Sequence, residues 1–202
     1  MKKKILLIFA LLSLVGCQIN QGAPIESSAG ALPITTNIAT DEFSYLNSEE
    51  HDILVGYPAD WAIKSTGTDV VIVRTPDQFP WGLNPPTSEP KYSVWTKGPY
   101  VDRSNIRWRI PQSAAEIAEK IAWTFTVSDS GEIIEPVTNI DIHGQDGATF
   151  TLNSRGDILY FIVYRVEYDK VAILDASGSP EDIDQMKSML NALALTLKPL
   201  ED

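Results

Sequence analysis

The sequence predicts an α+β fold in which an antiparallel β-sheet meander is flanked by helices. Two observations predict it. First, two amphipathic segments carry helix-start residues, one near residue 113 and one near residue 180. Second, the chain between them consists of strand-length apolar segments joined by glycine-containing turns. A chain that combines such helices with hairpin-linked strands belongs to the α+β class.

Residues 1–16 are typical of a bacterial export signal. Three lysines open the chain, and an apolar run follows from Ile5 to Val15. This run is shorter than the about 20 residues of a transmembrane helix, so we expect it to be cleaved. The segment Leu14-Val15-Gly16-Cys17 resembles the lipobox of bacterial lipoproteins. The resemblance implies that acyl chains such as palmitate are attached to Cys17. A secretory signal followed by a chance or a buried cysteine is the alternative.

Residues 17–40 are expected to comprise the lipidated cysteine and a flexible tether. The segment after Cys17 is rich in small and polar residues and shows no sustained period. We therefore expect the body in the cell envelope, lipid-anchored on the extracytoplasmic side. Gln18 stands where an aspartate would suggest inner-membrane retention, which favours the outer membrane if the source has two membranes.

The chain after the leader is strongly acidic. Removal of residues 1–16 takes away three lysines and leaves 13 basic against 27 acidic residues, a net charge of −14. A surface of this charge repels phosphate backbones, so no nucleic-acid partner is expected. Cys17 is the only cysteine, so no internal disulfide braces the fold. An apolar core must therefore stabilise the body.

The body, residues 41–202, is expected to be a single α+β domain. Its first strand signals are the run from Ile53 to Tyr57, which Pro58 ends, and the β-branched run from Val70 to Val73. These two runs are interpreted as neighbouring strands. Residues 92–95 and 106–108 are interpreted as edge strands.

Two helices are marked by their first residues. Ser113 and Glu116 form a capping box. Behind it, one apolar face repeats at helical spacing, formed by Ala114, Ile117, Ala118, Ile121 and Phe125. The second helix begins after Ser179 with Pro180 at its first position. Its apolar stripe consists of Ile183, Met186, Met189, Leu190 and Leu193.

Between the helices, alternating apolar residues predict a β-hairpin around a turn at residues 143–147. A second turn at residues 155–157 leads into a strand over 158–168, and a third at 169–170 into a strand over 171–176. These last two strands are apolar on both faces. We therefore expect them to lie centrally in the sheet, covered by a helix on at least one side.

The sequence contains few residues for chemistry. With only His51 and His143 present and Cys17 used by the anchor, multi-histidine and thiolate metal sites are excluded. His143 is interpreted as a solvated turn residue. His51, among acidic neighbours, is interpreted as part of a charged surface turn, with weak binding of a divalent cation as the alternative. No nucleophile elbow, phosphate loop or dinucleotide fingerprint is present, so we expect no catalytic residue, metal or cofactor.

The segment 79–108 is unusual because prolines and aromatic residues alternate in it. It holds three of the five tryptophans, and its candidate contact residues are Trp81, Trp95, Tyr100 and Trp108. Rigid aromatic side chains on proline-shaped loops suit contacts with peptides or sugars. The competing interpretation is that these rings cover the open end of the sheet as core. Trp81, between Pro80 and Gly82, is the preferred contact residue, and Trp95 and Trp108, in strand-like surroundings, are the preferred core residues.

The order of these elements resembles the PsbP and Mog1-like superfamily, which is widespread among bacterial lipoproteins. The matching positions are Tyr57, Pro58, Trp61, Gly144, the segment 147–150 and the segment 189–195. The resemblance covers residues 43–198 and implies an α/β/α sandwich with a non-enzymatic binding or assembly role. The partners of PsbP and Mog1, a photosystem and a small GTPase, are not carried over. A protein or peptide partner is therefore expected, and a surface hydrolase using a carboxylate pair is the alternative.

Overall fold

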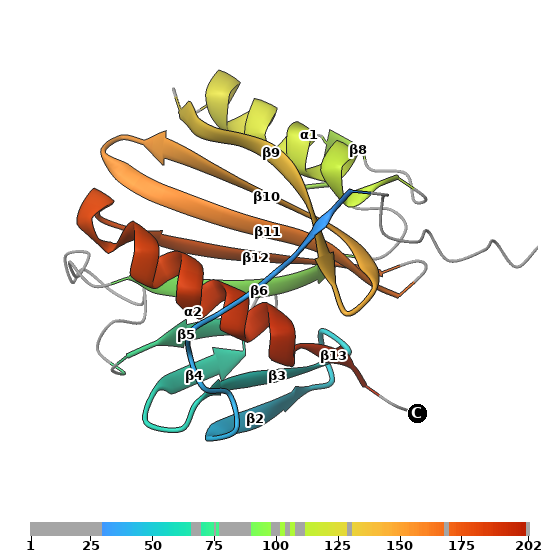
Figure 1. The fold of residues 1–202 in the computed structure, drawn as a ribbon, viewed down its shortest axis with the longest axis vertical. Helices are drawn as coiled ribbons and strands as arrows, with labels where there is room; N and C mark the ends of the chain where they lie inside the picture. The colour runs from blue at the N-terminus through green and yellow to red at the C-terminus, as the bar shows by residue number, and fades with distance from the viewer. Residues whose placement is uncertain are drawn as a thin grey trace, which may run out of the picture.

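The computed structural model describes residues 30–65, 70–74, 76, 90–97, 102–103, 106–107, 112–128, 131–167 and 170–200. At residues 95–97, 102–103, 106–107 and 128 it describes the backbone alone. Two helices lie on opposite faces of one large sheet, with a smaller sheet below (Figure 1). The predicted α+β class is confirmed.

The large sheet has eight strands in the order β1-β9-β10-β11-β12-β6-β5-β4. Their bounds are β1 Leu32–Pro33, β4 Ala62–Ser65, β5 Val70–Val73, β6 Lys91–Lys97, β9 Glu132–Ile142, β10 Gln145–Ser154, β11 Asp157–Glu167 and β12 Lys170–Gly178. Among the strands that the structure describes, only the β1–β9 pair is parallel. The small sheet has the order β13-β3-β2, formed by Lys198–Pro199, Ile53–Pro58 and Phe43–Ser48. Strands β7 Asp102–Arg103 and β8 Ile106–Arg107 pair with each other.

Helix α1, Ala114–Ser128, covers one face of the large sheet, and its start confirms the predicted capping box. The Ser113 N–H donates to Glu116 Oε2 at 2.8 Å, and the Glu116 N–H donates to Ser113 Oγ at 3.2 Å. The buried Asp146 on β10 adds an acceptor for the Ala114 N–H at 2.6 Å. The predicted apolar stripe of α1 packs on a core that includes the stacked rings of Phe150 and Phe161, 4.7 Å apart.

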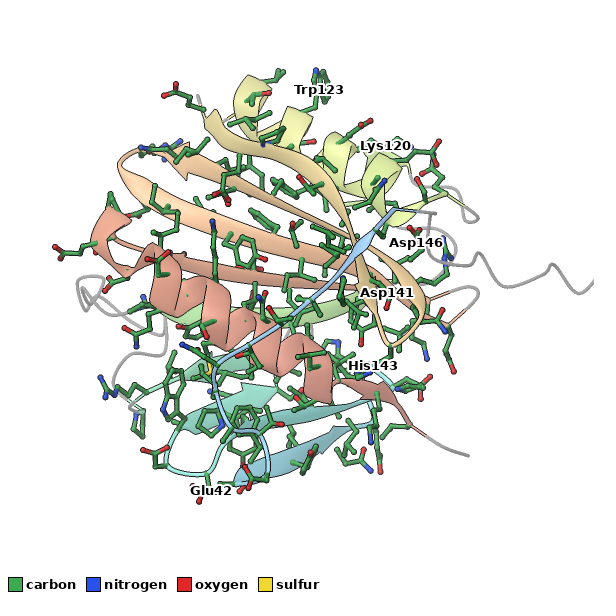
Figure 2. The ribbon with its side chains drawn as sticks, viewed as in Figure 1. Glu42, Lys120, Trp123, Asp141, His143 and Asp146 are labelled. Atoms are coloured by element: carbon green, nitrogen blue, oxygen red, sulfur yellow. The ribbon has the colours of Figure 1, made fainter. Side chains whose placement is uncertain are left out.

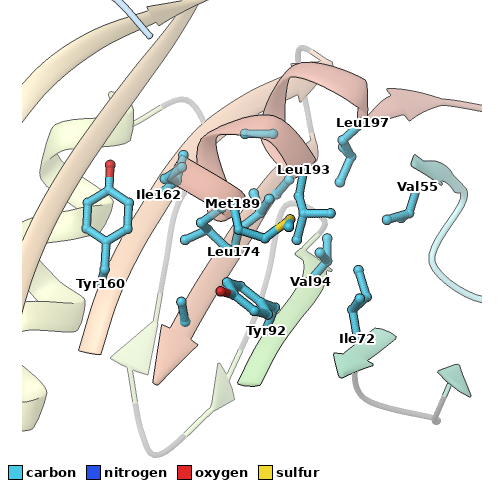
Figure 3. Packing of buried hydrophobic residues seen from close by; sticks show 14 of the residues in the cluster. Val55, Ile72, Tyr92, Val94, Tyr160, Ile162, Leu174, Met189, Leu193 and Leu197 are labelled. Atoms are coloured by element: carbon cyan, nitrogen blue, oxygen red, sulfur yellow. The ribbon is translucent and has the colours of Figure 1, made fainter. Parts of the chain in front are cut away.

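The opposite face of the large sheet is covered by the 3-10 turn η2, Pro180–Asp182, and helix α2, Ile183–Thr196. The predicted stripe of α2 packs on side chains from β6, β11 and β12, and on β3 and β5 beyond them (Figure 3). The close-up shows Met189 and Leu193 above Leu174 and Val94. Strands β11 and β12 are thus central, as predicted, and helices cover both of their faces.

Two hairpin turns of the sheet use the same local chemistry. His143 and Gly144 have φ values of 55° and 79°, and Arg155 and Gly156 have 58° and 97°. Two consecutive left-handed residues form the tight turn that suits the twist of a hairpin. The predicted hairpins are confirmed, but the first turn is shorter than the expected 143–147 because Gln145 already pairs with Ile142.

Strands β3 and β5 are not neighbours, so the predicted pairing was wrong. β3 pairs with β2 and β13 in the small sheet, whereas β5 pairs with β4 and β6. After Pro58 the chain turns, with the Trp61 N–H donating to Pro58 O at 2.9 Å, and enters the other sheet. The prediction that residues 92–95 form an edge strand was also wrong. These residues lie inside β6, between β12 and β5, because Tyr92 and Val94 are buried on the α2 side.

The tether was expected to extend over residues 17–40, but the last residues of this segment belong to the folded body. Leu32 and Pro33 pair with Ile140 and Asp141, and the partly buried Ile34 and Ile38 pack on the core of α2. We call residues 32–38 the strap, because they run across the outer side of α2 (Figure 1). In the described part of this segment, Ile34 and Ile38 therefore belong to the packed body and not to a tether.

Candidate binding surface on helix α1 and strand β9

Most of the residues predicted as sites lie outside the described residues. This holds for Cys17, Trp81, Tyr100 and Trp108. Trp95 is placed by its backbone alone, on β6 opposite Ile173 of β12. The contact roles of the four aromatic residues and the lipid attachment at Cys17 therefore stay predictions.

A surface that the sequence analysis missed lies around the connection between α1 and β9. Of the six large apolar side chains exposed in the described part of the chain, four fall between residues 123 and 134. They are Trp123, Val127, Ile133 and Ile134, exposed by 64%, 65%, 45% and 47%. Figure 1 shows α1 and β9 side by side at one end of the molecule. We call these four residues the α1–β9 surface.

Helical geometry explains why Trp123 is exposed. At about 100° per residue, Trp123 and Val127 lie roughly opposite the stripe centred near Ile117 and Ile121. Trp123 accordingly projects away from the sheet (Figure 2). The signal was readable in the sequence as an (i, i+4) apolar pair on the polar face of an otherwise amphipathic helix.

A cavity of about 350 Å³ opens beside Trp123, lined also by Gln112, Glu116, Glu119 and Lys120. The Lys120 ammonium donates to Gln112 Oε1 at 2.7 Å, which fixes the lysine across the first turns of the helix. An exposed indole next to a hollow rimmed by charged groups offers both an apolar anchor and polar contacts.

Strand β9 presents an outer edge that no strand pairs with over residues 132–139 in the described part of the chain. Two register shifts, opposite Phe150 and next to Leu152, interrupt its pairing with β10, and Pro136 lacks an N–H group. Bulges and prolines prevent an edge from pairing with another strand. The α1–β9 surface therefore offers a partner its side chains and not a row of unpaired backbone N–H and C=O groups.

A polar cluster ties β9 to α2 on the opposite face of the sheet. The Lys187 ammonium lies 2.6 Å from Glu135 Oε1, and the buried Thr151 hydroxyl donates to Glu135 Oε2 at 2.5 Å. Burial raises the pKa of Glu135, but the hydrogen bonds from Lys187 and Thr151 and the lysine charge outweigh it. The pKa of this carboxyl is therefore lower than its usual value of 4.5. The cluster stabilises the fold and leaves no free reactive group.

The two histidines have structural surroundings. His143 is exposed in its turn, as predicted, and its Nε2 lies 2.8 Å from the Leu195 carbonyl oxygen near the end of α2 (Figure 2). His51 was expected at the surface, but it is only 7% exposed because the turn after β2 folds it inward. No group of three or more potential ligands among histidine, cysteine, aspartate and glutamate could hold a metal ion in the described residues.

Comparisons with known proteins identify the fold. No family model and no curated protein matches the sequence. The solution structure of cyanobacterial PsbP (CyanoP) from Synechocystis sp. PCC 6803 is similar with a TM-score of 0.51 and 15% identity, covering 82% of this chain and 97% of that chain. The chain has a PsbP-like fold. The Saccharomyces cerevisiae Ran-binding protein Mog1p is similar at 12% identity with a TM-score of 0.45, covering 83% and 97% of the two chains.

This fold agrees with the resemblance seen in the sequence. At 15% identity the similarity concerns the fold alone. No helix in the part of the chain that the structure describes is long and apolar enough to span a bilayer.

Proposed function

We propose that the protein is a lipid-anchored module of the cell envelope that binds a protein partner without catalysing a reaction. Cys17 carries the acyl chains on the extracytoplasmic side, in the outer membrane if the source has two membranes. The α1–β9 surface contacts the partner. The observation that carries this proposal is the exposure of four large apolar side chains on two adjacent elements.

Exposure of Trp123 to water costs free energy, and packing of the fold does not require an apolar residue at this position. Trp123 and Val127 face away from the core, so a polar residue at either position would leave the stripe of α1 intact. Exposed apolar patches on soluble domains mark interaction sites, and tryptophan is among the residues that contribute most to binding. The net charge of −14 after the leader disfavours a second copy of this acidic chain and favours a partner with basic groups.

Two carboxylate pairs lie in cavities, and they bear on the hydrolase alternative. Glu116 and Glu119 line the cavity beside Trp123, and Glu181 and Asp182 line another near the start of α2. In each pair one member has a structural partner. Glu116 accepts the Ser113 N–H, and Asp182 accepts the Ser179 hydroxyl at 2.7 Å. Such capping roles favour a binding protein over an acid–base catalyst.

The anchor sets how far the body stands from the membrane. Because the strap begins at Leu32, fewer than 15 residues join it to Cys17. Fully extended, they span roughly 45–50 Å. This reach keeps the α1–β9 surface within range of membrane-associated partners.

The partner proposal is tested by site-specific photocrosslinking in cells of the source. A photoreactive residue at position 123 should crosslink one protein that is absent when the residue is placed at Asp184, which is exposed on α2. Adding Val127→Ser to the position-123 variant should weaken that crosslink. Identical products from both positions, or none at position 123, would contradict the proposed surface.

The anchor proposal is tested separately with Cys17→Ser. This variant should leave the membrane fraction, because stable attachment needs the two or more acyl chains that only a lipidated cysteine supplies. Labelling with a fatty-acid analogue should also be lost. Unchanged membrane retention of the variant would exclude Cys17 as the anchor.

A further inference from the structure

A second cavity lies at the start of α2, on the face of the sheet opposite to α1. Its volume is about 210 Å³, and Trp61, Pro90, Tyr92 and Gln185 contribute to its walls. The Trp61 and Tyr92 rings lie 5.5 Å apart and are tilted by 46°. Pro90 and Tyr92 belong to the aromatic, proline-rich segment that the sequence analysis singled out. At about 210 Å³ the cavity is smaller than the about 300–1,000 Å³ of pockets for drug-sized ligands, so it suits a smaller molecule.

The Tyr92 hydroxyl is a buried polar group without a hydrogen-bond partner among the described residues. The residue is 1% exposed, and its hydroxyl oxygen forms no hydrogen bond in the described part of the chain. Burial raises the pKa of Tyr92 above its ordinary value, the Asp182 carboxylate raises it further, and the Arg74 guanidinium opposes them. The two charged groups that act on this hydroxyl both line the cavity. A buried hydroxyl without a partner costs free energy, which a ligand in the cavity would recover.

Charged groups of opposite sign line the cavity. Arg74, which follows β5, carries a positive charge, and Glu181 and Asp182 of η2 carry negative charges. Among the described residues no ion pair joins Arg74 to either carboxylate within 4.0 Å. A ligand of a single charge would be attracted by the groups of one sign and repelled by those of the other. A ligand with both charges is attracted by both.

We propose that this cavity binds a small zwitterion with the size and charge pattern of a free α-amino acid. The carboxylate of the ligand pairs with Arg74, and its ammonium pairs with Glu181 and Asp182. The apolar part of the ligand rests on the Trp61 ring, and the Tyr92 hydroxyl bonds to the charged end nearest to it. This site is independent of the α1–β9 surface, because the two lie on opposite faces of the sheet.

The binding test uses the full-length protein in mild detergent with the standard free L-amino acids, measured by ligand-observed NMR and calorimetry. We expect at least one amino acid with an apolar side chain to bind. Its N-acetyl derivative, which lacks the ammonium, and its amide, which lacks the carboxylate, should each bind about tenfold or more weakly. Methyl glucoside serves as a neutral ligand of similar size and should not compete.

Variants test which charged group of the cavity contacts which charge of the ligand. Arg74→Gln should weaken binding of the amino acid about tenfold and abolish the preference over its amide, whereas Glu181→Gln should abolish the preference over the N-acetyl derivative. Both side chains are exposed, so both variants should unfold at the wild-type temperature. Glu119→Gln, the same change on α1, should bind like the wild type. Tyr92→Phe should also weaken binding, without loss of thermal stability.

Three results would overturn the proposal. One is that no free amino acid binds. The second is that the blocked derivatives bind as well as the zwitterion. The third is competition by methyl glucoside together with unchanged binding by Arg74→Gln, which would make the cavity a site for a neutral ligand.

Discussion

The two helices differ in what covers their outer sides. Helix α2 is held between the sheet and the strap: the Thr36 hydroxyl donates to Ser188 O at 2.8 Å, and the Asn191 amide donates to Thr35 O at 2.8 Å. Helix α1 packs on the sheet through one side only, and its other side carries the exposed Trp123 and Val127. Similar amphipathic helices therefore have two roles in this protein: α2 completes the core, and α1 both covers a core and presents an exposed surface.

The largest effect should come from the core beneath α2. Leu190→Ala should lower the free energy of unfolding by about 2–5 kcal/mol, because Leu190 is fully buried and its truncation leaves a cavity. Thermal and denaturant unfolding measure this loss. A change below about 1 kcal/mol would show that the layer under α2 can collapse around the gap, and would weaken the contrast between the helices.

A second effect tests the end of α2, where the small sheet joins it. A Cβ atom at Gly56 would lie 2.6 Å from Thr196 Cβ, so Gly56→Ala forces β3 and α2 apart. We expect a loss of about 1–3 kcal/mol in unfolding free energy. Hydrogen exchange should show the amides of β2 and β3 losing protection before those of β10. Uniform loss of protection would mean that the two sheets open together.

A third, smaller effect depends on pH and tests the polar link between β9 and α2. The pKa of Glu135 is lower in the folded protein than its usual 4.5. Ionised Glu135 therefore contributes to the stability of the fold above pH 4.5, and this contribution is lost as the pH falls through the pKa of the folded state. Glu135→Gln should therefore be less stable than the wild type at neutral pH, by at most about 1 kcal/mol because the side chain is 46% exposed. The difference should vanish in acid. A constant difference would assign the effect to packing.

The smallest effect on stability should come from the outer side of α1. Trp123→Ala should change the unfolding free energy by no more than about 0.5 kcal/mol, because most of the ring is in solvent. Binding of the photocrosslinked partner should nevertheless be lost. A stability loss comparable to that of Leu190→Ala would make Trp123 a structural residue and remove the basis of the α1–β9 surface.

Local signals in the sequence predicted much of this fold. The capping box at Ser113 and Glu116 marked the start of α1, and the apolar stripe marked α2. Asp141 and Asn153 each accept the N–H of a glycine three residues later, at 3.0 Å, so both hairpin turns were encoded within four residues. Such features depend only on neighbouring residues, which is why the sequence reveals them.

Packing between distant parts of the chain determined the features that the sequence did not predict. The pairing of β3 with β13 and the position of β6 inside the sheet depend on which buried faces meet across long stretches of chain. The burial of His51 and the strap over α2 have the same origin. The cavity at Arg74 and Glu181 likewise joins residues more than 100 positions apart in sequence, and no local pattern records that proximity. The sequence alone determined the two helices, the hairpins, the acidic charge and the expected anchor. The tertiary structure determined which side chains stayed exposed, because only packing decides which of them are left uncovered.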